Sequence, residues 1–238
     1  MKNYLLFLSL LFASIQIFAQ DYTPGSDAEK RETGSFNAIE ASLGITVYIT
    51  AGEEEAVYVT ADNKEHIKNI KTEVNGNTLK ITYTSEKLKI PKGVSGLKAY
   101  VTIAELRKID LGTGAEIHIP EEITLENLEI KGNTGGRLTG NLNITNNLSV
   151  SLSTGTSVEL TGSAAALNVD CSVGSNFYAY NLSASKCIAR AYTGAKLEVN
   201  VEDLLSATAT TGGQITYKGN ASLQEVNVKN GGSVKNDN

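Results

Sequence analysis

Apolar and polar residues alternate along most of this 238-residue chain, and a glycine interrupts the alternation about every 20 residues. We number each unit from this glycine as position zero, so that apolar residues fall at positions −5, −3 and +3 of nearly every unit. The anchoring glycines are Gly114, Gly135, Gly155, Gly174, Gly194, Gly212 and Gly231. Alternation with period two on both sides of a glycine predicts two short strands joined by a tight turn. Threonine precedes the glycine in five of the seven units, and its hydroxyl is expected to bond the turn backbone.

A unit of about 20 residues is too short to bury its own apolar face, but units stacked on one another form a continuous core. Equivalent strands of successive units then lie parallel, and connections between parallel strands are almost always right-handed. The pattern therefore predicts an all-β protein, a right-handed parallel β-helix with about 20 residues per coil. An antiparallel β-sandwich is the alternative, although it predicts hairpin turns without a fixed period.

Charged residues at the outward positions support the same stacking. In this register, residues of opposite charge lie beside each other on neighbouring strands, where like charges would be unfavourable. The expected neighbours are Lys108 with Glu129, Asp110 with Lys131, and Asp170 with Arg190. Such exposed pairs are each worth a few tenths of a kcal/mol, about 0.2–1 at most, so they indicate register rather than stability.

The segment before the repeats begins with the same template. With Gly44 at zero, Ile39, Ala41 and Val47 take the three apolar positions, which predicts a first coil. The chain then departs from the template: residues 56–61 and 97–103 are typical of strands, 62–70 of a single helical turn, and 70–83 of a hairpin around Gly76. We expect this excursion to cover the sheet edges of the first coil.

The N-terminal residues resemble a secretory signal peptide. Lys2 supplies the positive charge, an apolar run follows from Leu5 to Phe18, and Ala19 stands at a plausible cleavage point. No cysteine follows the run, so the sequence does not predict lipid attachment, and no later segment is apolar enough to span a membrane. We therefore expect an exported protein that resides in the periplasm, outside the cell or at the cell surface.

These boundaries divide the chain as follows: a signal peptide at 1–20, a flexible linker at 21–34, the first coil with its capping strands at 35–104, and the β-helix repeats at 105–238. Residues 35–234 are expected to form one continuous domain. Removal of residues 1–20 takes away only Lys2 among the charged residues and changes the net charge from −5 to −6. A nucleic-acid partner is not expected, because such proteins need a basic surface.

Several of these features together resemble one known family. They are the signal peptide, the opening "F-x-x-I-x-x-x-x-G-I-x-V-x-I" from Phe36 to Ile49, the hairpin of residues 70–83, and the glycine-turn repeats. This combination is similar to the head GIN domain family over about residues 35–234, with Gly44-Ile45-Thr46 where the family name refers to Gly-Ile-Asn. The resemblance implies a secreted β-helix of Gram-negative bacteria with an adhesin-like role. It carries over no catalytic residue.

The residues themselves form no catalytic constellation. His66 and His118 have no second histidine or cysteine at a ligand spacing, so neither a metal site nor a cofactor is predicted. Acidic clusters at 53–55, 121–122 and 202–203 fall where connecting segments are expected. We favour a non-enzymatic binding module that recognises a glycan or a cell-surface partner. A polysaccharide-active enzyme and a purely structural envelope protein are the alternatives.

One group of outward residues is a candidate ligand site. Tyr178 and Tyr180 alternate with inward residues and are expected to project side by side from one strand. Glu159 and Thr161 on the strand before, and Glu198 and Asn200 on the strand after, are their expected neighbours. Aromatic faces ringed by carboxylate and amide groups suit sugars, because the ring covers C–H faces while the polar groups bond hydroxyls. The alternative is that these tyrosines only pack on the neighbouring strands.

The register also predicts where the two cysteines lie and whether they can form a disulfide. Cys171 takes position −3 of its unit and Cys187 position −7 of the next, so both point inward but lie four residues apart along the strand direction. That offset is roughly 13 Å, at about 3.3 Å per residue. A disulfide needs Cα atoms within about 7 Å. The register therefore predicts two buried free thiols.

We expect export to remove the N-terminal segment after Ala19 or Gln20, because signal peptidase cleaves beyond the apolar run at small residues. N-terminal sequencing of the exported protein measures the cleavage point. An exported protein that still begins at Met1 would contradict the prediction.

Overall fold

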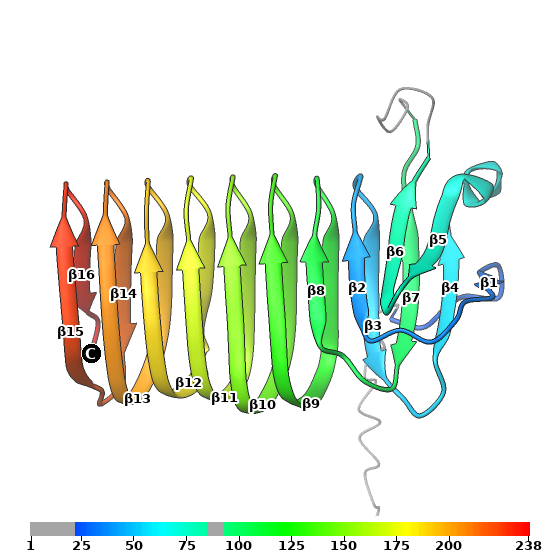
Figure 1. The fold of residues 1–238 in the computed structure, drawn as a ribbon. Coiled ribbons are helices and arrows are strands. Elements are labelled where there is room, and N and C mark those ends of the chain that lie inside the picture. The colour runs from blue at the N-terminus through cyan, green and yellow to red at the C-terminus, as the bar shows by residue number, and fades with distance from the viewer. Residues whose placement is uncertain (1–21, 85–92) are drawn as a thin grey trace, which may run out of the picture.

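The computed structural model describes residues 22–84 and 93–238, so the predicted signal peptide at 1–20 lies outside the described residues. The chain folds as an all-β, right-handed parallel β-helix (Figure 1), which confirms the fold predicted from the repeat. Its elements are β1(Glu29–Arg31), β2(Ala38–Ala41), β3(Thr46–Ala51), β4(Ala56–Thr60), η1(Lys64–Asn69), β5(Ile70–Asn75), β6(Thr78–Tyr83), β7(Lys98–Ile103), β8(Lys108–Leu111), β9(Glu116–Gly132), β10(Arg137–Leu152), β11(Ser157–Cys171), β12(Asn176–Ala191), β13(Lys196–Thr210), β14(Gln214–Lys218), β15(Ser222–Lys229) and β16(Ser233–Asn236).

The strands pair in the register that the glycine anchors predict. At position −5, Val150 lies between Ile130 and Val169 on the neighbouring strands. At position +3, Val158 lies between Leu138 and Phe177. The rows at both positions continue in the same way through the later coils. Because equal positions face equal positions, each inward row forms a continuous apolar ladder along the core.

The glycine turns are stacked as regularly as the strands. In most of them the residue at −1 and the glycine at zero both have positive φ, as at Thr154 (φ 50) and Gly155 (φ 71), which is the conformation of a type I′ turn. Each turn glycine donates its N–H to the carbonyl at −1 of the next coil, as from Gly135 to Thr154 at 3.0 Å. The recurring bond therefore uses the carbonyl at −1 and not the threonine hydroxyl that we expected. Hydroxyls that bond the turn belong to position +1, in Thr156 and Ser175.

The predicted first coil is present, and it lies inside the stack rather than at its end. Strands β2 and β3 pair on one side with β8 and β9, the first strands of the repeat region. On the other side they pair with β6 and β7, which extend both sheets by one further coil. After β7 the chain therefore passes back over the first coil to reach β8.

The rest of the excursion closes the N-terminal end, as the pattern predicted. Strand β4 pairs antiparallel with β7, and β5 pairs antiparallel with β6. The short helix η1 begins after its cap Asn63 and buries Ile67 between these strands. Residues 29–31, which we placed in a flexible linker, form β1 and pair with β4, and Arg31 donates to the Ile67 carbonyl at 2.9 Å. This part of the segment is therefore bound to the cap.

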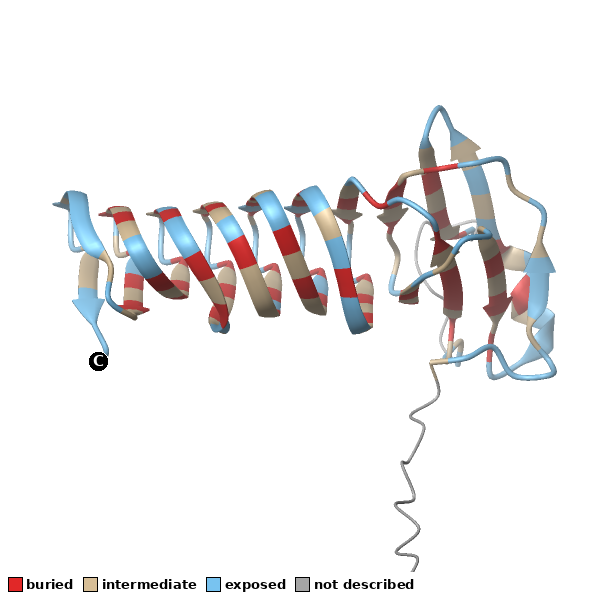
Figure 2. Ribbon diagram, turned by 90° about the horizontal axis from the view of Figure 1, so that it is seen from below, coloured by how far each residue is buried: buried red, intermediate tan, exposed pale blue. Residues whose placement is uncertain are grey.

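Buried and exposed residues alternate along the strands (Figure 2), and the inward residues form one core from Phe36 to Tyr217. Cys171 and Cys187 are buried free thiols, and the strand register places Cys187 opposite Leu167, four residues before Cys171. Burial raises the pKa of each thiol to about 12. The free-thiol prediction is therefore confirmed.

The expected charged neighbours are also side by side. Lys108 faces Glu129, Asp110 faces Lys131, and Asp170 faces Arg190. Only the last of these pairs forms an ion pair across strands, at 3.3 Å. The lysines of the first two pair along their own strands instead, Lys108 with Asp110 and Lys131 with Glu129, each at 2.7 Å. Residues two apart on a strand lie on the same face of the sheet, so a lysine can pair with an acid on its own strand as well as with one on the neighbouring strand.

We expect Val169→Asp to lower the melting temperature severely or to prevent folding. Val169 is fully buried between Val150 and Ala189, so the new carboxylate would be buried without a partner. That cost is several kcal/mol, which is comparable with the whole stability of about 5–15 kcal/mol. The matched control is Ser151→Asp, at an exposed position between Lys131 and Asp170. Circular dichroism melts compare the two, and an equal loss in both would contradict the inward and outward assignment.

Candidate functional site

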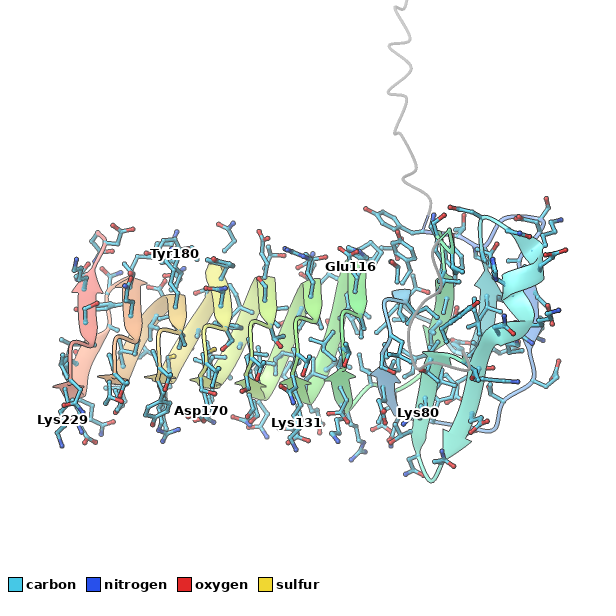
Figure 3. All side chains as sticks on the ribbon, turned by 90° about the horizontal axis from the view of Figure 1, so that it is seen from above. Lys80, Glu116, Lys131, Asp170, Tyr180 and Lys229 are labelled. Atoms are coloured by element: carbon cyan, nitrogen blue, oxygen red, sulfur yellow. The ribbon has the colours of Figure 1, made fainter. Side chains whose placement is uncertain are left out.

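Outward side chains give the β-helix two long faces (Figure 3). Glu116 and Tyr180 project from one face, formed by the strands that follow each turn, which we call the second-strand face. Lys131, Asp170 and Lys229 project from the opposite face, formed by the strands that precede each turn, which we call the first-strand face. A ligand that meets the side of the β-helix therefore meets one of two different surfaces.

The second-strand face carries a continuous row of side chains at position +4. Strand register alone generates this row, because equal positions of parallel strands lie side by side, about 4.8 Å apart. In order along the row, the residues are Tyr100, Tyr48, His118, Thr139, Glu159, Tyr178, Glu198, Thr216 and Lys235. We call this set the +4 row. It begins with aromatic rings and continues with hydroxyl and carboxylate groups.

Aromatic rings stack at the N-terminal end of the +4 row. The Tyr48 ring lies between those of Tyr100 and His118, with centroid distances of 5.4 Å and 5.2 Å, and Tyr22 packs against it at 5.6 Å. His118 is held by Thr139, whose Oγ1 is 2.8 Å from Nδ1. The sequence analysis did not select Tyr48, although it shares position +4 with His118 and Tyr178. Tyr100 had no such signal, because it belongs to the excursion.

Three of the predicted site residues meet in the +4 row. Tyr178 lies between Glu159 and Glu198, in the register that we expected. The Lys196 ammonium lies 5.5 Å from the centre of the Tyr178 ring and also pairs with Glu198. Its hydrogen bond with Glu198 raises the pKa of Lys196. The ring face is therefore occupied by a cation of the same chain.

The expected neighbours of Tyr180 are wrong. Thr161 faces Asn181, and Asn200 faces Ser183, so neither lies opposite Tyr180. Differences in coil length are the cause. Gly155 and Gly174 are 19 residues apart and Gly174 and Gly194 are 20 apart, which displaces Thr161. Gly194 and Gly212 are only 18 apart, which displaces Asn200. The strands absorb the two missing residues in register shifts after Ala179. Asn200 is therefore separated from the tyrosine that it was expected to accompany.

Tyr180 instead contacts the C-terminal segment. Its hydroxyl donates to Asp237 Oδ2 at 3.0 Å, 57 residues further along the chain. The Lys218 ammonium lies 5.4 Å from the ring centre. Burial, followed by the Asp237 carboxylate, raises the pKa of Tyr180 to about 12. Tyr178 and Tyr180 thus form neighbouring tyrosine–lysine contacts, which the sequence did not predict.

The first-strand face has two adjoining shallow hollows. Their volumes are about 460 Å³ and 300 Å³, and both are lined by Ser151 and Ser153. They arise because Ser151 is short, while Lys131 and Asp170 on either side of it are long. Charges of both signs rim the hollows, so they suit a polar ligand with no strong preference for either charge.

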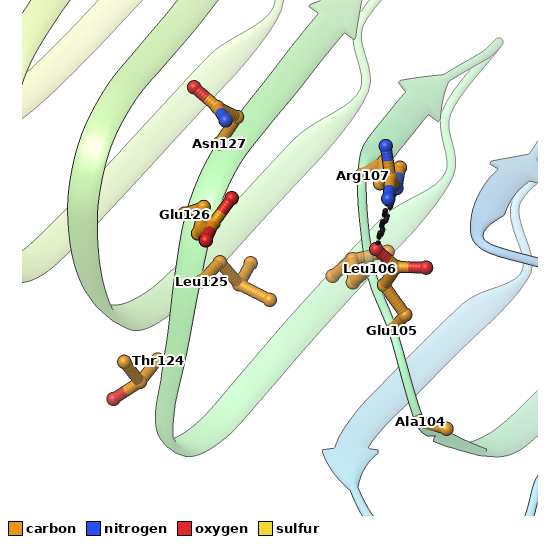
Figure 4. Close-up of a pocket in the computed structure, with 8 residues that line it drawn as sticks. All are labelled: Ala104, Glu105, Leu106, Arg107, Thr124, Leu125, Glu126 and Asn127. Atoms are coloured by element: carbon orange, nitrogen blue, oxygen red, sulfur yellow. Dashed lines mark hydrogen bonds and ion pairs between the residues drawn. The ribbon is translucent and has the colours of Figure 1, made fainter.

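A third hollow, of about 280 Å³, lies where the chain crosses back over the first coil (Figure 4). Residues 104–107 form one wall and residues 124–127 the other. Arg107 Nε donates to Glu105 Oε1 at 2.7 Å, and this contact raises the pKa of Arg107. No sequence signal marked this hollow, because it depends on where the crossing lies.

The remaining chemical candidates occupy ordinary structural positions. His66 Nδ1 lies 3.1 Å from the Tyr83 hydroxyl. The acidic residues at 121–122 and 202–203 lie within β9 and β13, at exposed positions, rather than in separate connecting segments. Within residues 22–84 and 93–238, no cluster of three or more histidine, cysteine or acidic side chains is placed to hold a metal ion. In the same residues, no helix has the length and apolar character needed to cross a membrane.

The family model described as "putative auto-transporter adhesin, head GIN domain" matches residues 35–221, from the first coil to the start of the last. The chain belongs to this family. The match covers the excursion as well as the repeats, so the cap is part of the head GIN domain.

Solved structures similar to this head GIN domain include two that are described as a "putative adhesin". One, from Bacteroides fragilis, has a TM-score of 0.77 at 23% identity, with 88% of this chain and 96% of that chain covered. Another, from Parabacteroides distasonis, has a TM-score of 0.67 at 16% identity, covering 88% and 96%. A third structure, also from P. distasonis, is described as a "putative lipid binding protein" and has a TM-score of 0.61 at 18% identity, covering 89% and 96%. At these identities the likeness shows the fold alone. No curated protein matches the chain.

We expect the contact between Tyr180 and Asp237 in this head GIN domain to weaken at high pH. The pKa of Tyr180 is raised from 10.0 to about 12 in the folded protein, so the fold favours the neutral phenol. The stabilisation is fully present below pH 10 and is lost as the pH rises through about 12. A pH titration of the tyrosine ring signals by NMR measures this, with Tyr180→Phe to assign the signal.

Asp237→Asn is expected to lower the pKa of Tyr180, because the carboxylate disfavours the phenolate. An unchanged titration in this variant would show that burial alone sets the pKa.

Proposed function

We propose that this chain is an exported, non-enzymatic, adhesin-like protein that binds a glycan or a cell-surface partner through its +4 row. The observation that supports the proposal most is the row itself. It runs in unbroken register from Tyr100 to Lys235 along the side of the β-helix. A straight row of aromatic and polar groups fits an extended ligand better than a small molecule. Membership of an adhesin family agrees with a role in attachment.

The centre of the proposed site is Tyr178 with Glu159 and Glu198. Aromatic faces suit the C–H faces of sugars, and carboxylates accept hydrogen bonds from hydroxyl groups. Lys196 covers the Tyr178 ring, but its side chain is 42% exposed on a flexible stem. A ligand that displaces it leaves the ammonium at the rim, where it donates to ligand oxygens. Tyr180 and Asn200 belong to the same proposed surface, each two residues further along its strand than Tyr178 and Glu198.

The location follows from the same proposal. Attachment to a partner outside the cytoplasm requires export, which the N-terminal residues predict and which the adhesin family suggests. The protein then acts in the periplasm, outside the cell or at the cell surface. A polysaccharide-active enzyme would need clustered acids at the bound glycan. In the +4 row the two nearest carboxylates, Glu159 and Glu198, lie on either side of Tyr178, two strand spacings or about 9.6 Å apart, at the upper limit for the paired acids of inverting glycosidases.

The test compares the wild-type protein with a Tyr178→Ala/Tyr180→Ala double variant on a glycan array and on whole cells. We expect the double variant to bind at least about tenfold more weakly, because buried aromatic contacts dominate binding energy. Circular dichroism establishes that it remains folded. Tyr192→Ala is the matched control, because it removes a tyrosine from the first-strand face of the same region.

Each outcome separates the candidate functions. Equal binding by the folded double variant, with or without loss in Tyr192→Ala, would place the site away from the +4 row. Release of new reducing ends from a bound polysaccharide would favour the enzyme. Failure of the wild-type protein to bind any glycan or cell would favour a structural envelope role.

A further inference from the structure

The last coil exposes its inward apolar residues. Leu223, Val226 and Val228 are 49%, 45% and 47% exposed. The residues at the equivalent positions of the preceding coil are no more than 1% exposed, namely Leu205, Ala207 and Ala209. The difference arises because a coil buries its inward row only when another coil stacks on it. The C-terminal end of the described β-helix therefore presents an uncovered cross-section of the core.

The strand edges at this end are uncovered as well. Among the described strands, β15 pairs only with β13, and β16 pairs only with β14. The residues after β16 do not cover them, because Asp237 bonds Tyr180 and the Asn238 side chain bonds Gly219 in earlier coils. The N-terminal end is different, since β1, β4, β5 and η1 close it. Uncovered edges next to exposed apolar residues are where another chain adds strands.

A local irregularity keeps this end apolar. The repeat predicts polar Gln224 at position −7 of the last coil, where the five preceding coils have an inward leucine or cysteine. The structure places Leu223 opposite Leu205 instead, with a register shift that leaves Gln224 out of the ladder. An inward polar residue would have suited an end that faces only water. The shift restores an apolar residue to the inward row.

We propose that the last coil is a dimerisation surface, on which a second copy of this chain docks end to end. In the proposed dimer, the β15 strands of the two copies pair antiparallel about a two-fold axis at Asn227. Residues equidistant from the axis then face each other, which brings Val226 of each copy opposite Val228 of the other. On the outward side, the same pairing brings Glu225 opposite Lys229. Among the described residues, neither Glu225 nor Lys229 takes part in an ion pair within its own chain.

This charge pattern favours a second copy over an unrelated partner. Glu225 and Lys229 stand at equal distances on either side of Asn227, so the strand is complementary to itself when reversed. A two-fold symmetric interface requires this property, because the same surface of both copies meets itself and residue i of one copy contacts residue j of the other while j contacts i. A shift of the axis by one residue in either direction removes both ion pairs.

The second sheet fits the same axis. Asn227 lies three residues before Asn230, and Val234 lies three residues after Gly231. Asn227 and Val234 are therefore at the same distance along their strands from the turn that joins β15 to β16. An axis at that distance from the turn places Val234 opposite its own copy and Ser233 opposite Lys235. No like charges then face each other, and both sheets run continuously from one copy to the other. The dimer would bury the apolar rows of both last coils.

The test measures the mass of the purified protein by analytical ultracentrifugation over a range of concentrations. We expect a monomer–dimer equilibrium for the wild-type protein. Glu225→Lys and Lys229→Glu should each weaken it roughly tenfold or more, because each places two like-charged pairs in the symmetric interface. The two single variants mixed together should form a heterodimer. In that heterodimer each position 225 faces a position 229 of opposite charge, whereas in either variant homodimer the two facing positions carry the same charge.

The double variant Glu225→Lys/Lys229→Glu serves as the matched control, and it should recover the wild-type equilibrium. Val228→Asp should abolish the dimer, while leaving the circular dichroism spectrum unchanged because Val228 is already half exposed. A wild-type protein that stays monomeric up to millimolar concentration would overturn the proposal. So would a dimer that withstands both the charge reversals and Val228→Asp, because it would form through another surface.

Discussion

The structure depends on a hydrogen bond between the turns of successive coils. Each turn glycine donates its N–H to the carbonyl at −1 of the next coil, so every coil must turn at the same level. At six of the seven accepting positions, all but Thr113, the residue at −1 has positive φ, even where it is a β-branched threonine or Val173. Such a conformation is unfavourable for a branched side chain in isolation. It persists because the stacked coils determine it.

The faces of the molecule follow from this alignment. Once the turns are level, every position of one coil lies beside the same position of the next, both inside and outside the β-helix. Inside, the alignment produces the apolar ladders of the core. Outside, it produces the +4 row, in which Tyr48 and Tyr178 belong to one surface although 130 residues separate them. A proposed binding surface of this kind needs no pocket, because its shape comes from repetition.

The two ends of the stack differ in how the core and the strand edges are covered. A parallel β-helix leaves an open core and free strand edges wherever coiling stops. At the N-terminal end, the excursion adds antiparallel strands and the short helix with Ile67. At the C-terminal end, the described chain adds nothing over Val226 and Val228. The inferred dimer closes this end with the same surface of a second copy.

The sequence by itself determined the coils, because alternation and turn glycines are local properties of the chain. The rows at −5, −3 and +3, the first coil at Gly44, the hairpin and the two free thiols could all be predicted from them. Only the tertiary structure decided where the strands of the excursion lie, and hence that Tyr100 stacks on Tyr48. It also decided which residues leave the register. Coils of 18 and 20 residues must be matched somewhere, and the pairing of β12 with β13 shifts after Ala179, which separates Tyr180 from Asn200. The shift lets a longer and a shorter coil both keep their flanking strands in register, since regular pairing resumes from Lys186 to Ala191.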